Sequence, residues 1–296
     1  MNLKDYPRRT YVIDQFTQPH NSELMGKSFY FVMDDGHDYE LNFTGINTVM
    51  WNYAGKTPKE ATFQCLKGDD TTYLLDFELA EFIDKPFERE DHFFIIDLEQ
   101  RLVTMAICKI GENPRFPYLV SSKYIFGAIK TEGMPLPFKR HVFTADMVGT
   151  RVEWHWNTAM TTRHCYYTSS FYRITSETMD GMEQDRGTRP SHILPSSDEI
   201  AQFIKIKDNL YLFSLVEEKM ERAMHDQNPT YRSNDMKFLQ NYDRMCHVGR
   251  TFGSIKEGGL ESESTNVIRC YILFGAFGNP IKLSDEFLNS SNPYAP

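Results

Sequence analysis

The stretch that decides the fold is Gly26-Lys27-Ser28-Phe29-Tyr30-Phe31-Val32-Met33-Asp34-Asp35-Gly36-His37-Asp38-Tyr39. Its first half is rich in aromatic and β-branched residues, which are typical of strands. Gly36 can adopt a positive φ without steric cost, so Asp34-Asp35-Gly36 predicts a tight turn between two antiparallel strands. The stretch therefore predicts a β-hairpin.

Runs of the same composition recur along the whole chain in two series. The first series is 28–33, 61–65, 73–77, 92–97, 102–108 and 118–128, and the second is 151–157, 163–174, 200–206, 210–216, 238–248 and 267–277. Turn-forming segments such as Gly68-Asp69 and Gly111-Glu112-Asn113-Pro114 separate the runs. The sequence therefore predicts an all-β, antiparallel protein.

The second series repeats the first in order and chemistry. The matching segments are Gly26-Lys27 with Gly149-Thr150, Tyr73-Leu74-Leu75 with Tyr211-Leu212-Phe213, and Phe126-Gly127-Ala128 with Phe274-Gly275-Ala276. The separation within a pair grows along the chain, which places longer loops in the second copy, at 175–197 and 219–235. Units of more than about 100 residues are too long for a solenoid or propeller repeat, so we expect a duplicated domain.

Each copy has enough strands for one small barrel. Closing an antiparallel sheet removes its exposed edges, and a barrel of about eight strands has room for one small ligand. Pro135 and Pro137 stiffen the segment between the two copies. We expect an N-terminal extension (1–22), a first barrel (23–133), a linker (134–140), a second barrel (141–284) and a C-terminal tail (285–296).

The charge balance argues against several classes of partner. The 296-residue chain has 32 Lys and Arg against 41 Asp and Glu, a formal net charge of −9 at pH 7. Such a chain has no overall positive field for nucleic acid or anionic lipid. No apolar run approaches the ~20 residues that span a bilayer, and residues 1–18 lack the apolar stretch of a secretory leader. We expect neither nucleic acid nor a membrane as a partner.

The cysteines indicate the compartment. There are five, an odd number, and no two form a C-x-x-C pair. This pattern excludes a disulfide framework and a zinc ribbon and is typical of a reducing environment. The sequence also lacks a glycine-rich phosphate loop and a Gly-x-Ser-x-Gly elbow. We therefore expect a cytoplasmic protein that uses no cofactor.

The richest chemistry lies in two segments that read as the arms of one hairpin, 151–157 and 163–167. Because successive side chains on a strand point to opposite faces, Val152, Trp154 and Trp156 share one face, which we expect to point inward. Indole offers a flat apolar wall and one N–H donor for an aromatic ligand. Packing of a ligand-free core is the alternative interpretation of the two tryptophans.

A histidine on the second arm could supply acid/base chemistry. His164 lies two residues from Tyr166 on the same strand face and could orient or protonate a bound phenol or enol. A structural histidine is the alternative. His155 on the paired strand could approach His164, but no third ligand has a recognisable spacing, so a metal site is not expected.

Two families resemble parts of this sequence. The stretch 26–39 resembles the opening hairpin of the phenolic acid decarboxylases, which are small lipocalin-like β-barrels. The segments 209–217, Asp243-Arg244 and 249–253 are similar to the MoaF family, which is named after molybdenum-cofactor gene clusters. Together the two resemblances span most of residues 24–280 and imply two tandem lipocalin-like antiparallel β-barrels.

The resemblance implies only part of a decarboxylase site. In the decarboxylases, two tyrosines of the first strand hold the substrate carboxylate. The equivalent positions here are Phe31 and Met33 in the first half and Trp154 and Trp156 in the second, so the carboxylate clamp is missing.

Other positions of the family pattern do carry over. Tyr39 matches a tyrosine after the hairpin, and Tyr172-Arg173-Ile174 matches a segment of a later strand. Glu217 falls on the acidic position that handles the proton, where burial next to apolar residues could raise its pKa. A solvated strand end is the alternative for Glu217. The partner arginine has several candidates: Arg163, Arg173, Arg186 and Arg189.

These residues lead to two functional hypotheses. The first is a cofactor-independent lyase or isomerase with Glu217, His164 and Tyr172 as catalytic residues. Its small aromatic, enolisable or polyketide-like substrate would be bound by Trp154, Trp156, Tyr166, Arg173, Tyr39 and Trp51. The alternative is a non-catalytic carrier or sensor of such a compound, with a possible link to molybdenum-cofactor genes. We expect the first barrel to be mainly structural, and a homodimer is possible.

Overall fold

The computed structural model describes residues 16–82, 88–113, 119–156, 160–179, 197–216, 230–257 and 267–280. Within these ranges the regular structure is almost entirely strand, apart from short 3₁₀ turns such as η3 (Ala80–Phe82). No helix in the described part of the chain is long and apolar enough to span a membrane. The all-β prediction is confirmed.

The first barrel is a nine-stranded antiparallel sheet in the order β4-β3-β2-β1-β9-β8-β7-β6-β5. Only Phe63 separates β4 from β5, so the covalent chain joins the two ends of the sheet. The strands are β1 (Ser28–Met33), β2 (Asp38–Phe43), β3 (Thr48–Tyr53), β4 (Lys59–Thr62), β5 (Gln64–Lys67), β6 (Thr72–Glu78), β7 (Arg89–Asp97), β8 (Leu102–Ile110) and β9 (Val120–Ile129).

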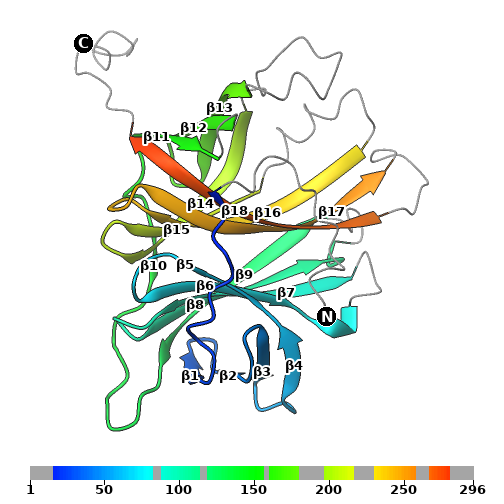
Figure 1. Cartoon of the computed structure of the whole chain (residues 1–296), viewed down its shortest axis with the longest axis vertical. Helices are drawn as coiled ribbons and strands as arrows, with labels where there is room; N and C mark the ends of the chain where they lie inside the picture. The colour runs from blue at the N-terminus through cyan, green and yellow to red at the C-terminus, as the bar shows by residue number, and fades with distance from the viewer. Residues whose placement is uncertain are drawn as a thin grey trace.

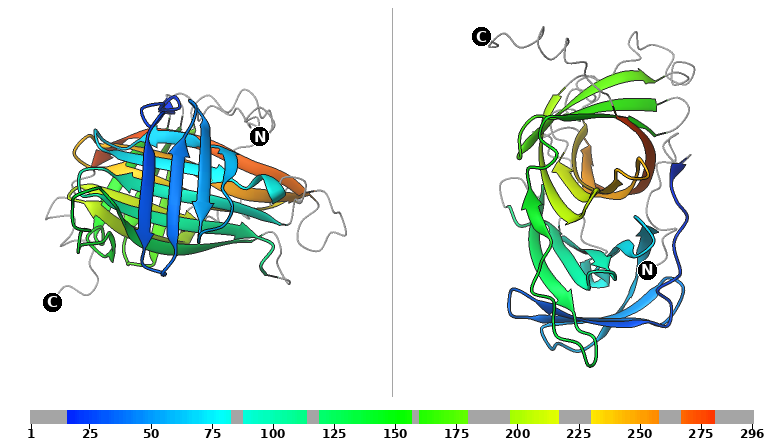
Figure 2. Two further views of the ribbon diagram at one scale, coloured as in Figure 1. Left: turned by 90° about the horizontal axis from the view of Figure 1, so that it is seen from below. Right: turned by 90° about the vertical axis from the view of Figure 1, so that its left-hand side faces the viewer.

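The second barrel is also nine-stranded and antiparallel, in the order β10-β14-β13-β12-β11-β18-β17-β16-β15. An additional β14–β15 pairing closes it into a ring, which the right-hand view of Figure 2 shows. Its strands are β10 (Val142–Thr144), β11 (Thr150–His155), β12 (Met160–Tyr166), β13 (Phe171–Met179), β14 (Ser197–Lys207), β15 (Leu210–Val216), β16 (Thr230–Asn241), β17 (Cys246–Glu257) and β18 (Val267–Pro280).

The two sheets have matching connectivity, so the predicted tandem barrels are confirmed. Strands β11 to β13 occupy the places of β1 to β3, and β15 to β18 those of β6 to β9. The continuous strand β14 replaces the broken pair β4 and β5. Gly26 and Gly149, which precede the equivalent strands β1 and β11, both have the positive φ that glycine tolerates (78° and 90°).

Three details of the sequence interpretation are wrong. The expected strand 163–174 is the hairpin β12–β13, and 238–248 contains the turn between β16 and β17. The matched glycines also lie on opposite faces. Gly127 faces Met33 inside the first barrel, whereas Gly275 lies against the backbone of Phe16. Because side chains alternate, the Phe126–Phe274 correspondence is displaced by one residue.

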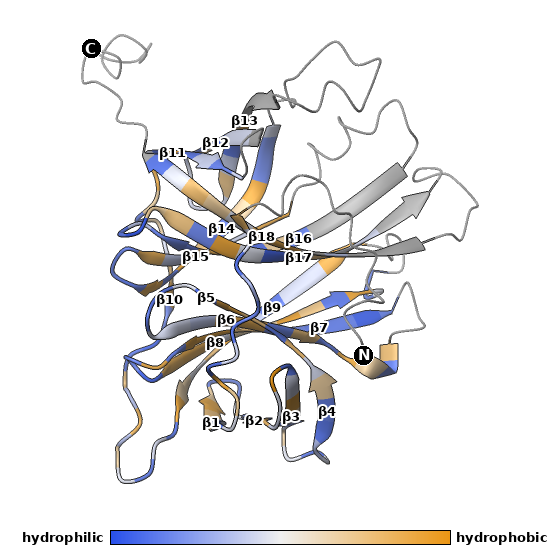
Figure 3. Ribbon diagram, in the orientation of Figure 1, coloured by the Kyte–Doolittle hydropathy of each residue, from blue (hydrophilic) through white to orange (hydrophobic). Residues whose placement is uncertain are grey.

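Apolar side chains form three cores. One fills each barrel, as the alternation of apolar and polar residues along the strands requires (Figure 3). The third lies between the barrels, where the outer faces of the two sheets pack against each other (Figure 1). It contains Leu66, Leu74, Phe93, Ile95, Ala106, Cys108 and Ile110 from the first barrel and Ile204, Ile206, Leu210, Leu212, Leu239, Val248 and Phe252 from the second.

Candidate functional site

The hairpin β11–β12 places aromatic side chains inside the second barrel. In its register Trp154 lies opposite Thr162, and Val152 lies opposite His164. Val152, Trp154 and Trp156 are all buried in the second core, the inward orientation that alternation predicts. His155 lies on the other face, where its Nε2 contacts the Glu153 carboxylate at 3.0 Å.

His164 lies at the centre of this interior. Its Nδ1 is 3.4 Å from the Tyr166 hydroxyl, its Nε2 is 3.2 Å from the Thr162 hydroxyl, and its ring lies 5.0 Å from that of Tyr172. Burial lowers the pKa of His164 to about 3. The imidazole is therefore neutral near pH 7, so one nitrogen donates a hydrogen bond and the other accepts one.

The Tyr166 hydroxyl joins several strands. It accepts hydrogen bonds from Trp154 Nε1 at 3.3 Å and from Gln240 Nε2 at 3.2 Å, and Tyr242 in turn donates to Gln240 Oε1 at 2.8 Å. Burial raises the pKa of Tyr166 to about 12, so the phenol stays protonated. The structure thus brings together the predicted residues Trp154, Trp156, His164, Tyr166 and Tyr172.

A second histidine, to which the sequence assigns no role, completes the interior. His247 on β17 lies among the rings of Trp154, Trp156 and Phe238, with centroids 4.5, 4.8 and 4.8 Å away. Neither of its ring nitrogens has a hydrogen-bond partner. Burial, with His164 nearby, holds its pKa well below the usual value. The alternation of inward and outward side chains along β17 could have shown that His247 points inward. The sequence analysis instead predicted one strand over 238–248, so it missed the start of β17 at Cys246.

The interior of the second barrel therefore offers neutral polar groups on an aromatic surface. Neutral His247 has one free N–H donor and one free acceptor nitrogen, both buried. Buried polar groups in proteins are nearly always paired with protein, water or ligand. The His247 imidazole is therefore a buried polar group of this interior whose nitrogens have no partner among the described residues.

Tyr39 and Trp51 lie apart from this cluster, in the first barrel. The Tyr39 hydroxyl donates to His92 Nδ1 at 2.7 Å, and His92 Nε2 contacts Glu90 at 2.9 Å. Trp51 stacks on Tyr39 with ring centroids 6.0 Å apart. Both nitrogens of His92 are thus partnered, in contrast to those of His247. Neither His92 nor Glu90 was singled out from the sequence, because their positions on β7 become meaningful only once the barrel closes and Tyr39 of β2 reaches His92 across its interior.

The remaining predicted residues are not brought to the second interior. Arg173 lies on the exposed outer face, where its Nε and Nη2 each bond the Asp198 carboxylate at 2.8 Å. Arg163 is also on the outside and contacts Glu153 at 3.0 Å. Glu217 lies outside the described residues, as do Arg186 and Arg189. The structure therefore places no arginine of the described ranges beside His164.

Metal ligands do not cluster in the described part of the chain. Among those residues, no three His, Cys, Asp or Glu side chains are placed to hold a metal ion. Cys65, Cys108, Cys165 and Cys246 are free thiols.

Comparison with known protein families finds a match in the first part of the chain. A search of curated proteins with the whole chain found no match. Residues 10–112 match the model of the MoaF N-terminal domain, a range that includes strands β1 to β8. The segments of the second barrel that resemble MoaF lie beyond the matched range. The resemblance of the chain to the MoaF family is thereby confirmed, but the match lies on the first barrel, where the sequence suggested the decarboxylase hairpin, and it is to that family's N-terminal domain.

Proposed function

We propose that the interior of the second barrel binds a small aromatic or enolisable compound. The observation that carries this proposal is His247, whose two ring nitrogens are buried without a partner among the rings of Trp154, Trp156 and Phe238. Leaving a buried polar group unpaired costs about 1–3 kcal/mol. A bound phenol or enol, whose hydroxyl can pair with one of the two imidazole nitrogens, would remove part of that cost and stack on the indoles.

The first barrel supports this division between the two copies. Its inward histidine, His92, contacts the Tyr39 hydroxyl with one ring nitrogen and the Glu90 carboxylate with the other, so neither His92 nitrogen is unpaired. The free cysteines and the negative net charge support a cytoplasmic setting. A carrier or sensor role is consistent with these features.

Tryptophan fluorescence can test the binding proposal selectively. The chain has three tryptophans, and Trp51 is the one in the first barrel, so Trp51→Phe leaves only the two indoles beside His247. We expect members of a panel of para-hydroxylated aromatic acids and their neutral esters to change this emission saturably. His247→Phe should abolish the response, while the matched His92→Phe should retain it. An equal response in both variants would contradict the proposal.

The second candidate function is a cofactor-independent lyase or isomerase. The observation that favours it is the chain Tyr166–His164–Thr162, in which a phenol and an alcohol contact the two nitrogens of one imidazole. Such a chain can pass a proton between two positions of a bound substrate, and one positioned acid/base group contributes about 10²–10⁴ in rate. The low pKa of His164 makes imidazolium a minor species, which is why binding is the first proposal.

Ultraviolet absorbance distinguishes turnover from binding. Wild-type protein mixed with the same panel would bleach the conjugated band over hours if a lyase or isomerase acts on it, whereas binding gives a stable shift. Glu217→Gln tests the acid implied by the resemblance, and His164→Gln tests the imidazole. Undiminished bleaching in both variants would refute the catalytic roles assigned to them.

A further inference from the structure

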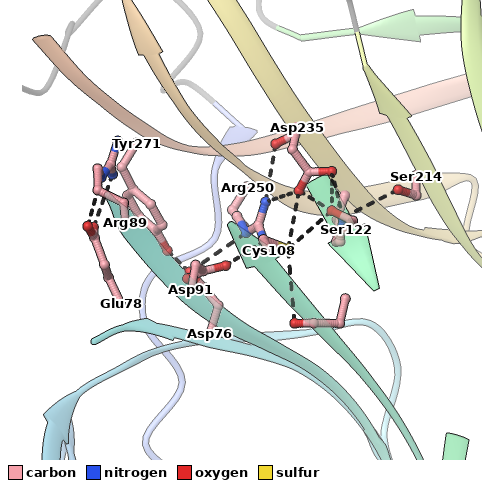
Figure 4. A network of polar contacts seen from close by, with 12 residues as sticks. Asp76, Glu78, Arg89, Asp91, Cys108, Ser122, Ser214, Asp235, Arg250 and Tyr271 are labelled. Carbon is pink, nitrogen blue, oxygen red and sulfur yellow. Dashed lines mark hydrogen bonds and ion pairs between the residues drawn. The ribbon is translucent and has the colours of Figure 1, made fainter. Parts of the chain in front are cut away.

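A group of charged side chains is buried between the two barrels. They come from the outer faces of β6 and β7 in the first barrel and of β16 and β17 in the second (Figure 4). Charged groups are costly to bury unless they are paired. The described members are four acids and three bases, all of them buried: Asp76, Glu78, Asp91, Asp235, Arg89, Lys237 and Arg250.

The three bases are matched by three of the acids. Arg89 makes a two-pronged contact with Glu78, at 2.7 and 3.0 Å. Lys237 Nζ lies 2.6 Å from Asp235 Oδ1. The guanidinium of Arg250 bridges the barrels, because Nη2 bonds Asp91 of the first barrel at 2.6 Å while Nη1 bonds Asp235 of the second at 2.8 Å.

Asp76 is the acid in excess. Its Oδ1 accepts a hydrogen bond from the Tyr271 hydroxyl at 2.9 Å. Its closest charged contact, Arg250 Nε, is 3.8 Å from Oδ2, beyond hydrogen-bond distance. With four carboxylates ionised, these seven described side chains would carry one uncompensated negative charge at a buried site.

Two carboxylate oxygen atoms of the group have no hydrogen-bond donor, which indicates where a proton could neutralise the excess negative charge. Asp76 Oδ2 and Asp91 Oδ1 are buried, and neither has a donor among the surrounding groups. The two carboxyls lie on neighbouring strands and contact the same guanidinium: in the β6–β7 register Asp76 is opposite Phe93, two residues from Asp91, and Arg250 lies 3.8 Å from Asp76 and 2.6 Å from Asp91. Two ionised carboxylates can only accept, so they can bond each other only when one of them carries a proton.

We propose that Asp76 and Asp91 hold one shared proton in the folded protein, and that this proton balances the charges of the seven described side chains. The packing of the two barrels is then linked to pH. The pair behaves as one titrating unit, so the proton belongs to both carboxyls rather than to either alone.

The surrounding groups are consistent with this assignment. Burial raises the pKa of Asp76 to about 6, and it holds that of Asp91 well above its usual value. The same cause raises the pKa of Cys108 to about 11 and that of Tyr271 well above its usual value, so these two groups stay neutral. Among the described residues, the titratable and charged groups that interact with the pair on this face are Glu78, Cys108, Asp235, Arg250 and Tyr271, whereas Cys65 lies on the other face of the sheet, inside the first barrel.

The direction of the pH dependence follows from the raised pKa. An aspartate in the unfolded chain loses its proton near pH 3.8, whereas the folded pair keeps one to about pH 6 or above. The folded state therefore binds more protons in this window, and the stabilisation is full below pH 3.8 and is lost as pH rises. A shift from 3.8 to about 6 corresponds to roughly a 100-fold change in the unfolding equilibrium constant.

The variant Asp76→Asn tests the shared proton, because an asparagine amide can donate to Asp91 Oδ1 as a protonated carboxyl would. The ratio of the unfolding equilibrium constants of wild type and variant is measured from pH 4 to pH 8.5 by urea unfolding. We expect the ratio of the wild-type unfolding constant to that of the variant to rise about 100-fold from pH 4 to pH 8.5, because only wild type loses the stabilisation from the shared proton. A constant ratio would overturn the proposal.

Glu78→Gln is the matched control for this test, and infrared spectroscopy gives a second readout of the proton. Glu78→Gln removes the same charge from the cluster but breaks the pair with Arg89, so it should destabilise the protein without making this gain. The same gain in both variants would overturn the assignment to Asp76 and Asp91. Infrared difference spectra of the folded wild type should show a carboxylic-acid C=O band at pH 5, below the titration of the pair, that Asp76→Asn lacks, and its absence in wild type would also overturn the proposal.

Discussion

Replacing His247 by phenylalanine should stabilise the protein while removing its proposed ligand site. The ring sits among Trp154, Trp156 and Phe238, an environment that suits an apolar ring. Its two nitrogens are buried and unpaired, so the native residue carries a desolvation cost that no described contact offsets. Phenylalanine retains the aromatic contacts and removes that cost.

The magnitude follows from two opposing effects. Removing an unpaired buried polar group is worth about 1–3 kcal/mol. The phenyl ring is slightly larger than imidazole, so its fit against the three neighbouring rings offsets part of this gain. We expect a net stabilisation of about 1 kcal/mol, which for a protein of this size raises Tm by roughly 2–4 °C.

Differential scanning calorimetry without added ligand measures this effect. The control is His164→Phe, which should lower Tm because it leaves the Tyr166 and Thr162 hydroxyls without their imidazole partner. If His247→Phe instead costs more than about 1 kcal/mol, the imidazole has a structural partner and the reasoning behind the ligand site is refuted.

Three further predictions concern stability. Arg250→Met should cost about 3–5 kcal/mol in urea unfolding, because it leaves buried Asp91 without its cation and removes the bond that joins Asp91 to Asp235, and a loss under 1 kcal/mol would show that the bridge contributes little. Leu212→Ala between the barrels should cost about 2–5 kcal/mol, whereas the exposed Leu136→Ala should stay within about 0.5 kcal/mol, and equal effects would argue against a packed interface. The pKa of His164 falls from 6.5 to about 3 on folding, so the unfolded state binds the extra proton and His164 costs up to about 5 kcal/mol of stability as pH falls from 6.5 towards 3. His164→Gln should flatten this acid-side loss in a urea series, and an unchanged slope would contradict it.

Local pattern explains which parts of the fold could be predicted. Alternation along 151–157 was enough to orient Trp154 and Trp156 inward, and Gly36 was enough to place the first hairpin. The turns after β12 and β16 were missed because residues 167–170 and 242–245 contain neither Gly nor Pro, and Met245 adopts a positive φ instead. Hairpins without such signals look like one long strand.

The contacts between distant segments could not be predicted. Arg250 and Asp91 are separated by more than 150 residues, and nothing in either strand shows that the two outer faces meet. Each charge, taken alone, reads as a solvated residue on the outside of a barrel. His247 was missed for a related reason, since its unpaired nitrogens become evident only when the opposite hairpin is in place.

The most direct test of the ligand site is the indole emission of the Trp51→Phe protein, titrated with para-hydroxylated aromatic acids and their neutral esters. The account predicts a saturable change for at least one compound, lost in His247→Phe and retained in His92→Phe. If no compound changes the emission, or if the response survives in His247→Phe, the second barrel is not the binding site proposed for it.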